Sequence, residues 1–361
     1  RLRSLVENLE NQHAYLLIFG PLKSGKSTLM NAISGSYVSE VTSLHSLYVH
    51  ATKNADIAPL AALTQLTQLR ISSSRVADLQ PLAGLTGLTD LSVSGSPVTD
   101  LSAISGLTGL VTLGLSEVHA TALPDLGRLD SLTTLTLSSN QLADASLTGL
   151  DALRTVSATR NKLTTLRISD APKLESVDAT GNQLSELRPT NLPALTEVTA
   201  SWNALASTSG LSELPKLTRL ALPRNQLTEL AGLDKLPALA ELDFYANQLT
   251  DLAPLAALPL TSLRAPFNKV THLPVFTNAD HLATLDLSWN ELVDVSALAL
   301  LWSLTDAKFT GNHIADLSVF SGSKATVHAE DQTILAAREV MVGVPIPIPL
   351  RGPDGGFPDI K

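Results

Sequence analysis

The residues with the most defined chemistry lie near the amino end of the chain, in a phosphate-binding pattern. Residues 20–27 are a complete match to G-x-x-x-x-G-K-[ST], and they lie between a predicted buried strand at residues 15–19 and a predicted helix at residues 28–34. In such a loop the glycines let backbone N–H groups curl around phosphates, the lysine reaches the β and γ phosphates, and the serine holds Mg²⁺. The nucleotide-binding candidates are Gly20, Gly25, Lys26, Ser27 and Thr28.

A P-loop GTPase needs further parts that this sequence does not supply. It needs a carboxylate for Mg²⁺, usually in D-x-x-G, and an N-K-x-D or T-K-x-D segment that reads the base. The useful D-x-x-G, residues 178–181, is explained by the repeat described below, and the lysines after Thr52, Asn161 and Asn268 complete no base-reading motif. A single strand also cannot form the parallel sheet that gives a nucleotide its pocket.

Residues 16–42 resemble the start of the GTPase domain of bacterial dynamin-like proteins, on the run Gly20-Pro-Leu-Lys-Ser-Gly-Lys-Ser-Thr-Leu-Met-Asn-Ala-Ile-Ser-Gly35. The resemblance implies phosphate and magnesium roles for Lys26 and Ser27. Three interpretations of residues 1–43 stay open: a cap over the open end of a solenoid, a GTP- and Mg²⁺-binding segment, or a recombined or joined fragment. We assign the cap and keep the nucleotide reading, with the repeats as its sensor arm, as the alternative. The two differ in whether residues 12–35 have a sheet to join.

From Leu44 to about Phe320 the chain follows a leucine repeat of 21 or 22 residues, L-x-x-L-x-L-x-x-N-x-L. The first positions of its 13 repeats are Leu44, Leu66, Leu88, Leu110, Leu132, Leu153, Leu174, Leu195, Leu217, Leu239, Leu260, Leu282 and Leu304. One repeat cannot bury its leucines until the next coil stacks on it. The period therefore predicts an α/β leucine-rich-repeat solenoid with a parallel β-sheet on its concave face.

Two polar columns accompany the leucines. Position nine is asparagine in nine successive coils: Asn140, Asn161, Asn182, Asn203, Asn225, Asn247, Asn268, Asn290 and Asn312. An amide can donate and accept, so we assign this column to backbone groups and not to a ligand. The return side carries Asp56, Asp78, Asp100, Asp251, Asp294 and Asp316, which predict caps of short helical or 3₁₀ turns. Calcium binding is the alternative, although the spacing of a calcium loop is missing.

Large side chains gather on the strand surface from the eighth repeat onward. Repeat positions three, five, seven and eight face the concave surface, and in the amino half they are mostly Ser, Thr and Gly, which predicts a bland face there. In the carboxyl half they include the predicted partner-binding residues Trp202, Arg219, Arg224, Tyr245, Arg264, Phe267, Trp289 and Lys308. Trp, Tyr and Arg dominate binding hot spots, although packing at the edge of the strand layer would also place aromatic residues at position eight.

Composition excludes several functions. A net charge of −9 argues against nucleic acid as a partner. The sequence contains no run of 18 apolar residues, so it predicts no transmembrane segment. The 8 histidines are scattered, and there is no cysteine. We therefore expect no catalytic residue, no metal site, no cofactor and no enzymatic activity, but a monomer that binds a protein or glycan ligand on its concave face.

The carboxyl end leaves the repeat after Phe320. Residues 325–329 and 331–335 predict short strands that close the last coil, and residues 342–350 alternate proline with apolar residues. With the Asp251-Leu-Ala-Pro-Leu255 type of repeat, residues 44–361 resemble internalin-like surface proteins of Gram-positive bacteria, in which an immunoglobulin-like segment follows the repeats. The resemblance implies a secreted or cell-surface bacterial protein, whereas the nucleotide alternative implies a cytoplasmic one. We predict three segments: residues 1–43 as the cap, 44–325 as the solenoid, and 326–361 as a β cap with the start of a truncated immunoglobulin-like segment.

Overall fold

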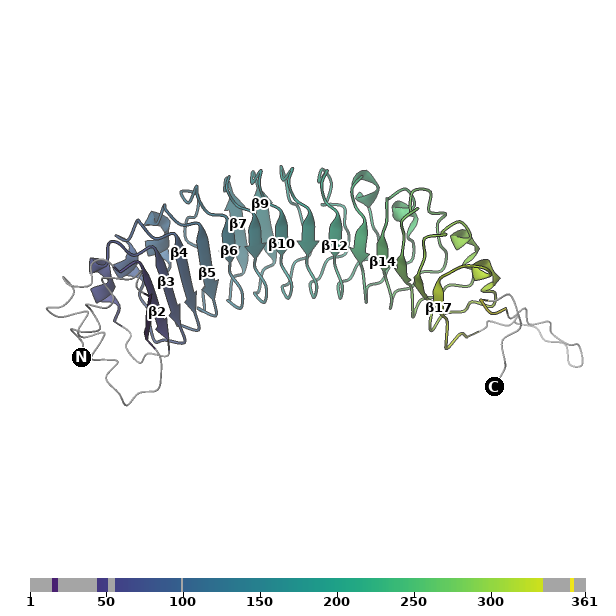
Figure 1. Cartoon of the computed structure of the whole chain (residues 1–361), viewed down its shortest axis with the longest axis horizontal. Helices are drawn as coiled ribbons and strands as arrows, with labels where there is room; N and C mark the ends of the chain where they lie inside the picture. Colours follow the sequence, from purple (N-terminus) through teal and green to yellow (C-terminus); the bar gives the residue numbers. More distant parts are fainter. Residues whose placement is uncertain (1–14, 19–43, 51–55, 99, 334–350, 354–361) are drawn as a thin grey trace, which may run out of the picture. The chain divides into compact units, whose positions relative to one another are not determined.

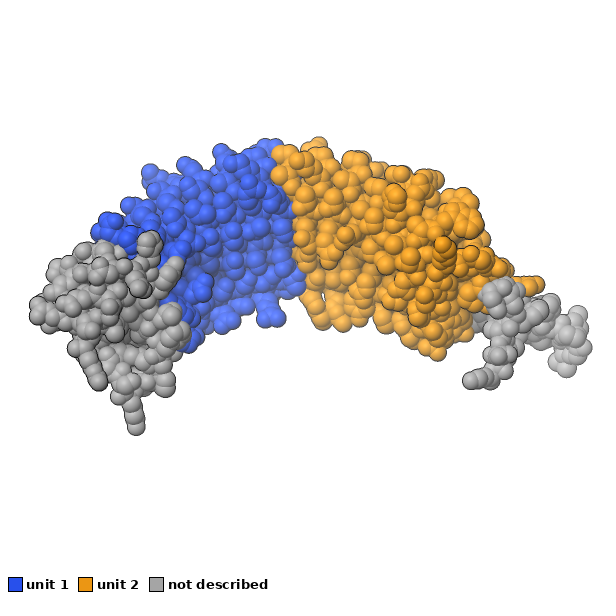
Figure 2. Space-filling model, in the orientation of Figure 1, with its two compact units in different colours: residues 1–183, 189–192 blue, residues 184–188, 193–361 orange. Residues whose placement is uncertain are grey.

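The computed structural model describes residues 15–18, 44–50, 56–98, 100–333 and 351–353. They fall into two compact units, coloured separately in Figure 2: residues 1–183 with 189–192, and residues 184–188 with 193–361. The predicted nucleotide-binding residues Gly20, Gly25, Lys26, Ser27 and Thr28 lie outside the described residues. Nucleotide binding therefore stays a prediction.

In the first unit, parallel strands form one sheet, with one strand for each turn of the chain (Figure 1). In order they are β1 (Tyr15–Ile18), β2 (Ser46–His50), β3 (Gln68–Ser72), β4 (Asp90–Ser94), β5 (Thr112–Ser116), β6 (Thr134–Thr136), β8 (Thr155–Ser157) and β10 (Ser176–Asp178). Neighbouring strands pair at equal repeat positions, so Leu47 lies opposite Leu69 and Leu69 opposite Leu91. The return segments add a two-stranded parallel sheet, β7 (Asp144–Thr148) with β9 (Thr165–Ser169).

The strand predicted at residues 15–19 forms as β1 and joins the repeat sheet. Tyr15 lies opposite Ser46 and Ile18 opposite Val49, in parallel. The described part of the amino-terminal segment thus extends the sheet of the repeats by one strand. The assignment of residues 1–43 as a cap stays a prediction, because most of that segment lies outside the described residues.

The second unit repeats this arrangement. Its parallel strands are β11 (Glu197–Thr199), β12 (Arg219–Ala221), β13 (Glu241–Asp243), β14 (Ser262–Arg264), β15 (Thr284–Asp286), β16 (Asp306–Lys308) and β17 (Thr326–His328). The short strand predicted at residues 325–329 is confirmed as β17. The strand predicted at residues 331–335 is wrong for residues 331–333, which form no strand.

Gln332 explains why a turn forms there. Its Nε2 donates to the carbonyl of Phe309 at 2.8 Å, and its Oε1 accepts the N–H of Ile314 at 2.9 Å. These are the bonds that the repeat asparagines make, so Gln332 continues their column for one more turn.

The leucines of the repeat fill the interior. In the fifth repeat Leu132, Leu135, Leu137 and Leu142 are each at most 1% exposed. Full burial of such a side chain contributes about 1.5–3 kcal/mol. The predicted solenoid of about 13 leucine-rich turns is confirmed, and its described return segments contain 3₁₀ turns in place of α-helices. These turns are η2 (Ala58–Ala62), η3 (Gln80–Leu82), η4 (Ser102–Gly106), η5 (Leu233–Lys235), η6 (Ala253–Leu255), η7 (Ser296–Leu298) and η8 (Ser318–Phe320).

Six of these turns begin just after one of the predicted capping aspartates. Each carboxylate accepts, at 2.8 Å, the N–H of the first residue of the turn, so the aspartate stands one residue before the N-cap position. Hydrogen bonds from Ser102 lower the pKa of Asp100, and those from Ser318 lower the pKa of Asp316. Within the described ranges, no three His, Asp or Glu side chains gather so that they could hold a metal ion. None of the helices described there is long and apolar enough to cross a membrane.

The asparagine column joins consecutive turns from inside. Asn247, 8% exposed, accepts the N–H of Leu227 from the preceding turn at 3.0 Å. Its amide nitrogen donates to the carbonyls of Leu222, in the preceding turn, and Phe244, in its own turn, both at 3.0 Å. One side chain therefore satisfies three buried backbone groups that belong to two turns.

We predict that Asn247→Ala lowers the free energy of unfolding by on the order of 2–4 kcal/mol, because it leaves those backbone groups buried without partners. Urea unfolding followed by circular dichroism measures this loss. The matched control is Gln248→Ala, at an exposed neighbouring position, for which we expect a change under about 0.5 kcal/mol. Equal losses for the two variants would show that the asparagine column does not stabilise the turns.

Candidate binding surface

The aromatic residues of the carboxyl half stand on a left-handed backbone. Position eight of the repeat has a positive φ, between 49° and 72°, wherever it is described. Its residues are Ser73, Gly95, Glu117, Ser139, Arg160, Gly181, Trp202, Arg224, Ala246, Phe267, Trp289 and Gly311. A Cβ is crowded in this conformation, so a residue other than glycine costs about 1 kcal/mol there. Local backbone preference therefore favours glycine at position eight.

Burial does not explain the three large rings at this position. Trp202, Phe267 and Trp289 remain 58%, 48% and 47% exposed. These rings therefore lie on the surface of the strand layer and not in the leucine interior.

The rings and one cation contact each other in a continuous row, which we call the aromatic ladder: Trp202, Arg224, Tyr245, Phe267 and Trp289. The guanidinium carbon of Arg224 lies 4.2 Å from the ring centroid of Trp202 and 5.1 Å from that of Tyr245. Tyr245 meets Phe267 edge-on at 5.5 Å, and Phe267 stacks on Trp289 at 5.7 Å with an angle of 15°. Such pairs are each worth about 0.5–1.5 kcal/mol, and they hold the rings in place.

A glycine in the next turn makes room for the last ring of the ladder. A Cβ on Gly311 would lie 2.6 Å from a ring atom of Trp289. Gly311 also has a φ of 71°, so glycine suits this position for both reasons. The sequence analysis missed this residue, although a glycine at position eight directly after Trp289 is visible in the sequence.

Beside the ladder, charged side chains alternate along the strands. Arg219 lies between Glu197 and Glu241, at 3.1 and 2.6 Å. The hydrogen bond to Glu241 is the main reason that the pKa of Arg219 is raised. These pairs are half-exposed, so each contributes at most about 1 kcal/mol, and their main effect is to order the charges.

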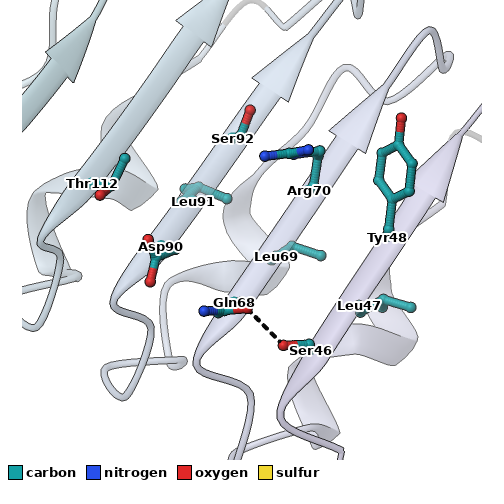
Figure 3. A pocket seen from close by; sticks show the side chains of 10 residues that line it. All are labelled: Ser46, Leu47, Tyr48, Gln68, Leu69, Arg70, Asp90, Leu91, Ser92 and Thr112. Carbon is teal, nitrogen blue, oxygen red and sulfur yellow. Dashed lines mark hydrogen bonds between the residues drawn. The ribbon is translucent and has the colours of Figure 1, made fainter. Parts of the chain in front are cut away.

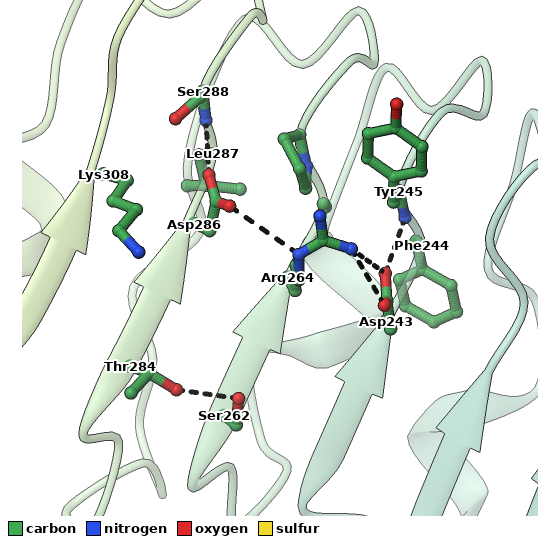
Figure 4. A network of polar contacts seen from close by, with 12 residues as sticks. Asp243, Phe244, Tyr245, Ser262, Arg264, Thr284, Asp286, Leu287, Ser288 and Lys308 are labelled. Atoms are coloured by element: carbon green, nitrogen blue, oxygen red, sulfur yellow. Dashed lines mark hydrogen bonds and ion pairs between the residues drawn. The ribbon is translucent and has the colours of Figure 1, made fainter.

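A second set of alternating charges follows strands β13 to β16 (Figure 4). Arg264 lies between Asp243 and Asp286, at 3.0 and 3.8 Å, and Lys308 lies 3.0 Å from Asp306. Asp243 is oriented by the N–H of Tyr245 at 2.9 Å. The guanidinium of Arg264 also faces the ring of Tyr245 at 4.9 Å, which connects this set to the ladder.

The structure thus places all eight predicted partner-binding residues on one exposed surface of the second unit. Arg219, Arg264 and Lys308 are neutralised by carboxylates. Arg224 differs, because in the part of the chain that the structure describes it has no carboxylate within ion-pair distance, and its polar contact is the Tyr245 hydroxyl at 3.3 Å.

The expectation of a bland face in the amino half is incomplete. On the first strands of that half, Tyr48, Gln68, Arg70 and Asp90 line a hollow. Their places at repeat positions three and five could have revealed them, but the serines and threonines of the later repeats dominated the pattern.

Comparisons with known proteins agree with the fold. No protein-family model matches the sequence, and no curated protein matches it significantly. The chain is similar to an internalin, inlF, of Listeria monocytogenes, with a TM-score of 0.62 and 24% identity over 81% of this chain and 82% of that one. It is also similar to a leucine-rich-repeat protein of Leptospira interrogans, with a TM-score of 0.74 and 21% identity over 92% and 94%.

A third similar structure is a chain of the LRIM1/APL1C complex, with a TM-score of 0.60 and 21% identity over 80% of this chain and 51% of that one. At such identities the likeness shows the fold alone. The chain therefore has the leucine-rich-repeat fold that its sequence predicts.

We predict that Trp289→Gly changes the free energy of unfolding by less than about 1 kcal/mol, because relief of the left-handed strain offsets the lost stacking on Phe267. Urea unfolding measures the change. Phe244→Ala, at a ring that is 0% exposed, is the comparison, with an expected loss of about 3–5 kcal/mol. A loss of similar size for Trp289→Gly would make Trp289 a core residue.

Proposed function

We propose that this protein is a non-enzymatic recognition module that binds a protein partner through the aromatic ladder. One observation carries the proposal: bulky rings occupy exposed positions whose backbone conformation favours glycine. Stacking within the row only balances the cost of this backbone conformation, so contact with a partner is the contribution that favours large rings there. Aromatic residues are the ones that contribute most at interfaces.

The ladder has the character of an interface centre. Its side chains are ordered by mutual stacking, which lowers the entropy lost on binding. The ion pairs of Arg219 and Arg264 border it with polar groups, as at the rim of an interface. Arg224 supplies a charge without a carboxylate partner among the described residues, so we expect an acidic or carbonyl-rich group of the partner to lie over it.

A protein fits this surface better than a glycan does. The ladder crosses five consecutive turns, which at the ~4.8 Å spacing of strands gives a length of roughly 20 Å. It is an open row of rings, and a stable protein interface covers about 800 Å² on each partner. At the level of the fold, the likeness to a chain of the LRIM1/APL1C complex supports a role in protein association.

Location and assembly belong to the same proposal. The internalin-like repeats, and the likeness to inlF, support a secreted or cell-surface bacterial protein. We propose as well that the chain acts as a monomer. Fractionation of the producing cells, with sedimentation equilibrium of the purified chain, tests both statements. Recovery in the cytoplasm would contradict the first, and a stable dimer the second.

The partner is best identified by cross-linking from the ladder itself. A photoreactive phenylalanine at position 245 should capture a protein that the same group at position 302 does not. Trp302 is the matched control residue, because it is 78% exposed and lies in a return segment. The captured protein is then purified for binding measurements.

We predict that the double variant Trp202→Ala with Trp289→Ala raises the Kd for that partner by at least ~100-fold, since two hot-spot rings are lost. The melting temperature should change by only a few degrees, and Trp302→Ala should bind as the unmodified chain does. Calorimetric titration and thermal unfolding give both values. Unchanged binding by the double variant would refute the proposal.

A further inference from the structure

The first unit contains a hollow that the proposed partner site does not use. Its volume is about 350 Å³, and it lies over strands β2 to β5, with Tyr48, Gln68, Arg70, Asp90 and Ser92 around it (Figure 3). Pockets for small ligands begin at about 300 Å³. The hollow therefore suits a small molecule or one unit of a chain, and not the broad contact of a folded protein.

The hollow exists because the side chains at position five of the repeat become much smaller between β3 and β4. Position five is Tyr48 in β2 and Arg70 in β3, but only Ser92 in β4 and Gly114 in β5, and the strand register places these residues side by side. The base of the hollow is formed by buried leucines that lie between the side chains at positions three and five. These are Leu47, Leu69 and Leu91, each at most 3% exposed. Within the part of the chain that the structure describes, the lining of the hollow thus comes from strands of the sheet.

Arg70 differs from Arg219 and Arg264 of the second unit in the residues that flank it on the neighbouring strands. Arg219 and Arg264 each have a carboxylate on both neighbouring strands, whereas the cross-strand neighbours of Arg70 are Tyr48 and Ser92. Among the described residues no carboxylate lies within ion-pair distance of Arg70, and its guanidinium carbon stands 5.8 Å from the ring centroid of Tyr48. Figure 3 shows this side chain extended along the sheet toward Ser92. A guanidinium in this setting can bind a carboxylate through two parallel hydrogen bonds.

The row at position three supplies neutral and acceptor groups. Gln68 accepts the Ser46 hydroxyl at 2.9 Å, so its amide N–H groups can still donate. Asp90 accepts the Thr89 hydroxyl at 2.8 Å through one oxygen, so its other oxygen can accept a hydroxyl of a ligand. Asp90 lies on β4, the strand next to that of Arg70, where it pairs with Gln68 and stands diagonal to Arg70. A group that recognises a carboxylate and groups that recognise hydroxyls thus lie in neighbouring rows of the same hollow.

We propose that this hollow binds an acidic sugar unit, with its carboxylate on Arg70 and its hydroxyls on Gln68 and Asp90. The aromatic face of Tyr48 borders the ligand beside Arg70. The site lies in the first unit, and it does not rest on the proposed function of the ladder.

The experiment titrates the full chain with D-glucuronate, D-galacturonate and N-acetylneuraminate, and follows the ligands by saturation-transfer NMR. We expect at least one of them to bind with a Kd on the order of 1 mM, which is the range for so small a ligand on an open site. Arg70→Gln should weaken that binding at least tenfold. Arg75→Gln is the matched control, because it removes the same charge from the same repeat outside the hollow, and it should bind unchanged.

Two further probes separate the sugar from a bare charge. D-glucuronamide keeps the hydroxyls but lacks the charge, and acetate keeps the charge but lacks the hydroxyls. Both should bind at least tenfold more weakly than the best acidic sugar. No saturable binding of the three acidic sugars, equal binding by Arg70→Gln, or acetate binding as tight as the sugar would each overturn the proposal. The ladder variants Trp202→Ala and Trp289→Ala should leave this binding intact, so failure of one site does not imply failure of the other.

Discussion

The rest of this structure depends on the buried asparagine at position nine. Asn247 accepts a backbone N–H from the preceding turn and donates to carbonyls of both turns, so the pitch from turn to turn is set by hydrogen bonds as well as by leucine packing. An unpaired polar group in this interior would cost about 1–3 kcal/mol, which makes the column hard to interrupt. Where Asn is absent near the amino end, Ser74 and Ser96 bond to each other at 2.9 Å. At the carboxyl end, after the last Asn of the column, Gln332 makes the equivalent hydrogen bonds.

Because these hydrogen bonds and the leucines stabilise the turns from inside, the fold depends less on the side chains of the outer strand surface. Positions one, four, six, nine and eleven hold the turns together, so the residues at positions three, five, seven and eight can vary. In the second unit they carry stacked rings and paired charges. In the first unit they form a hollow around one arginine. The same scaffold thus offers two surfaces of different chemistry, each fixed by side chains that are one strand spacing apart.

The sequence was sufficient for the fold, because both the leucine period and the hydrogen-bonding capacity of asparagine are properties of one repeat. It also identified Trp202, Phe267 and Trp289 as large aromatic residues that share position eight of the repeat. It could not give the contacts between turns: the place of Arg224 between two rings, or the room that Gly311 makes for Trp289. These contacts depend on register and rotamers across 20 or more residues.

The strand predicted at residues 331–335 is wrong at its described residues for a related reason. Gln332 takes the place of the repeat asparagine there, and a pattern written with Asn does not detect a glutamine. The predicted roles of Lys26 and Ser27 lie outside the described residues and stay predictions.

We propose that stability and recognition reside in different positions of the repeat. Saturation mutagenesis of residues 195–333 tests this separation, with folded abundance and binding of the cross-linked partner measured separately. We expect substitutions at position nine to lower abundance and binding together, and substitutions at Trp202, Arg224, Phe267 and Trp289 to lower binding while abundance is kept. If the position-eight variants lose abundance as the position-nine variants do, the ladder is part of the fold and the account is wrong.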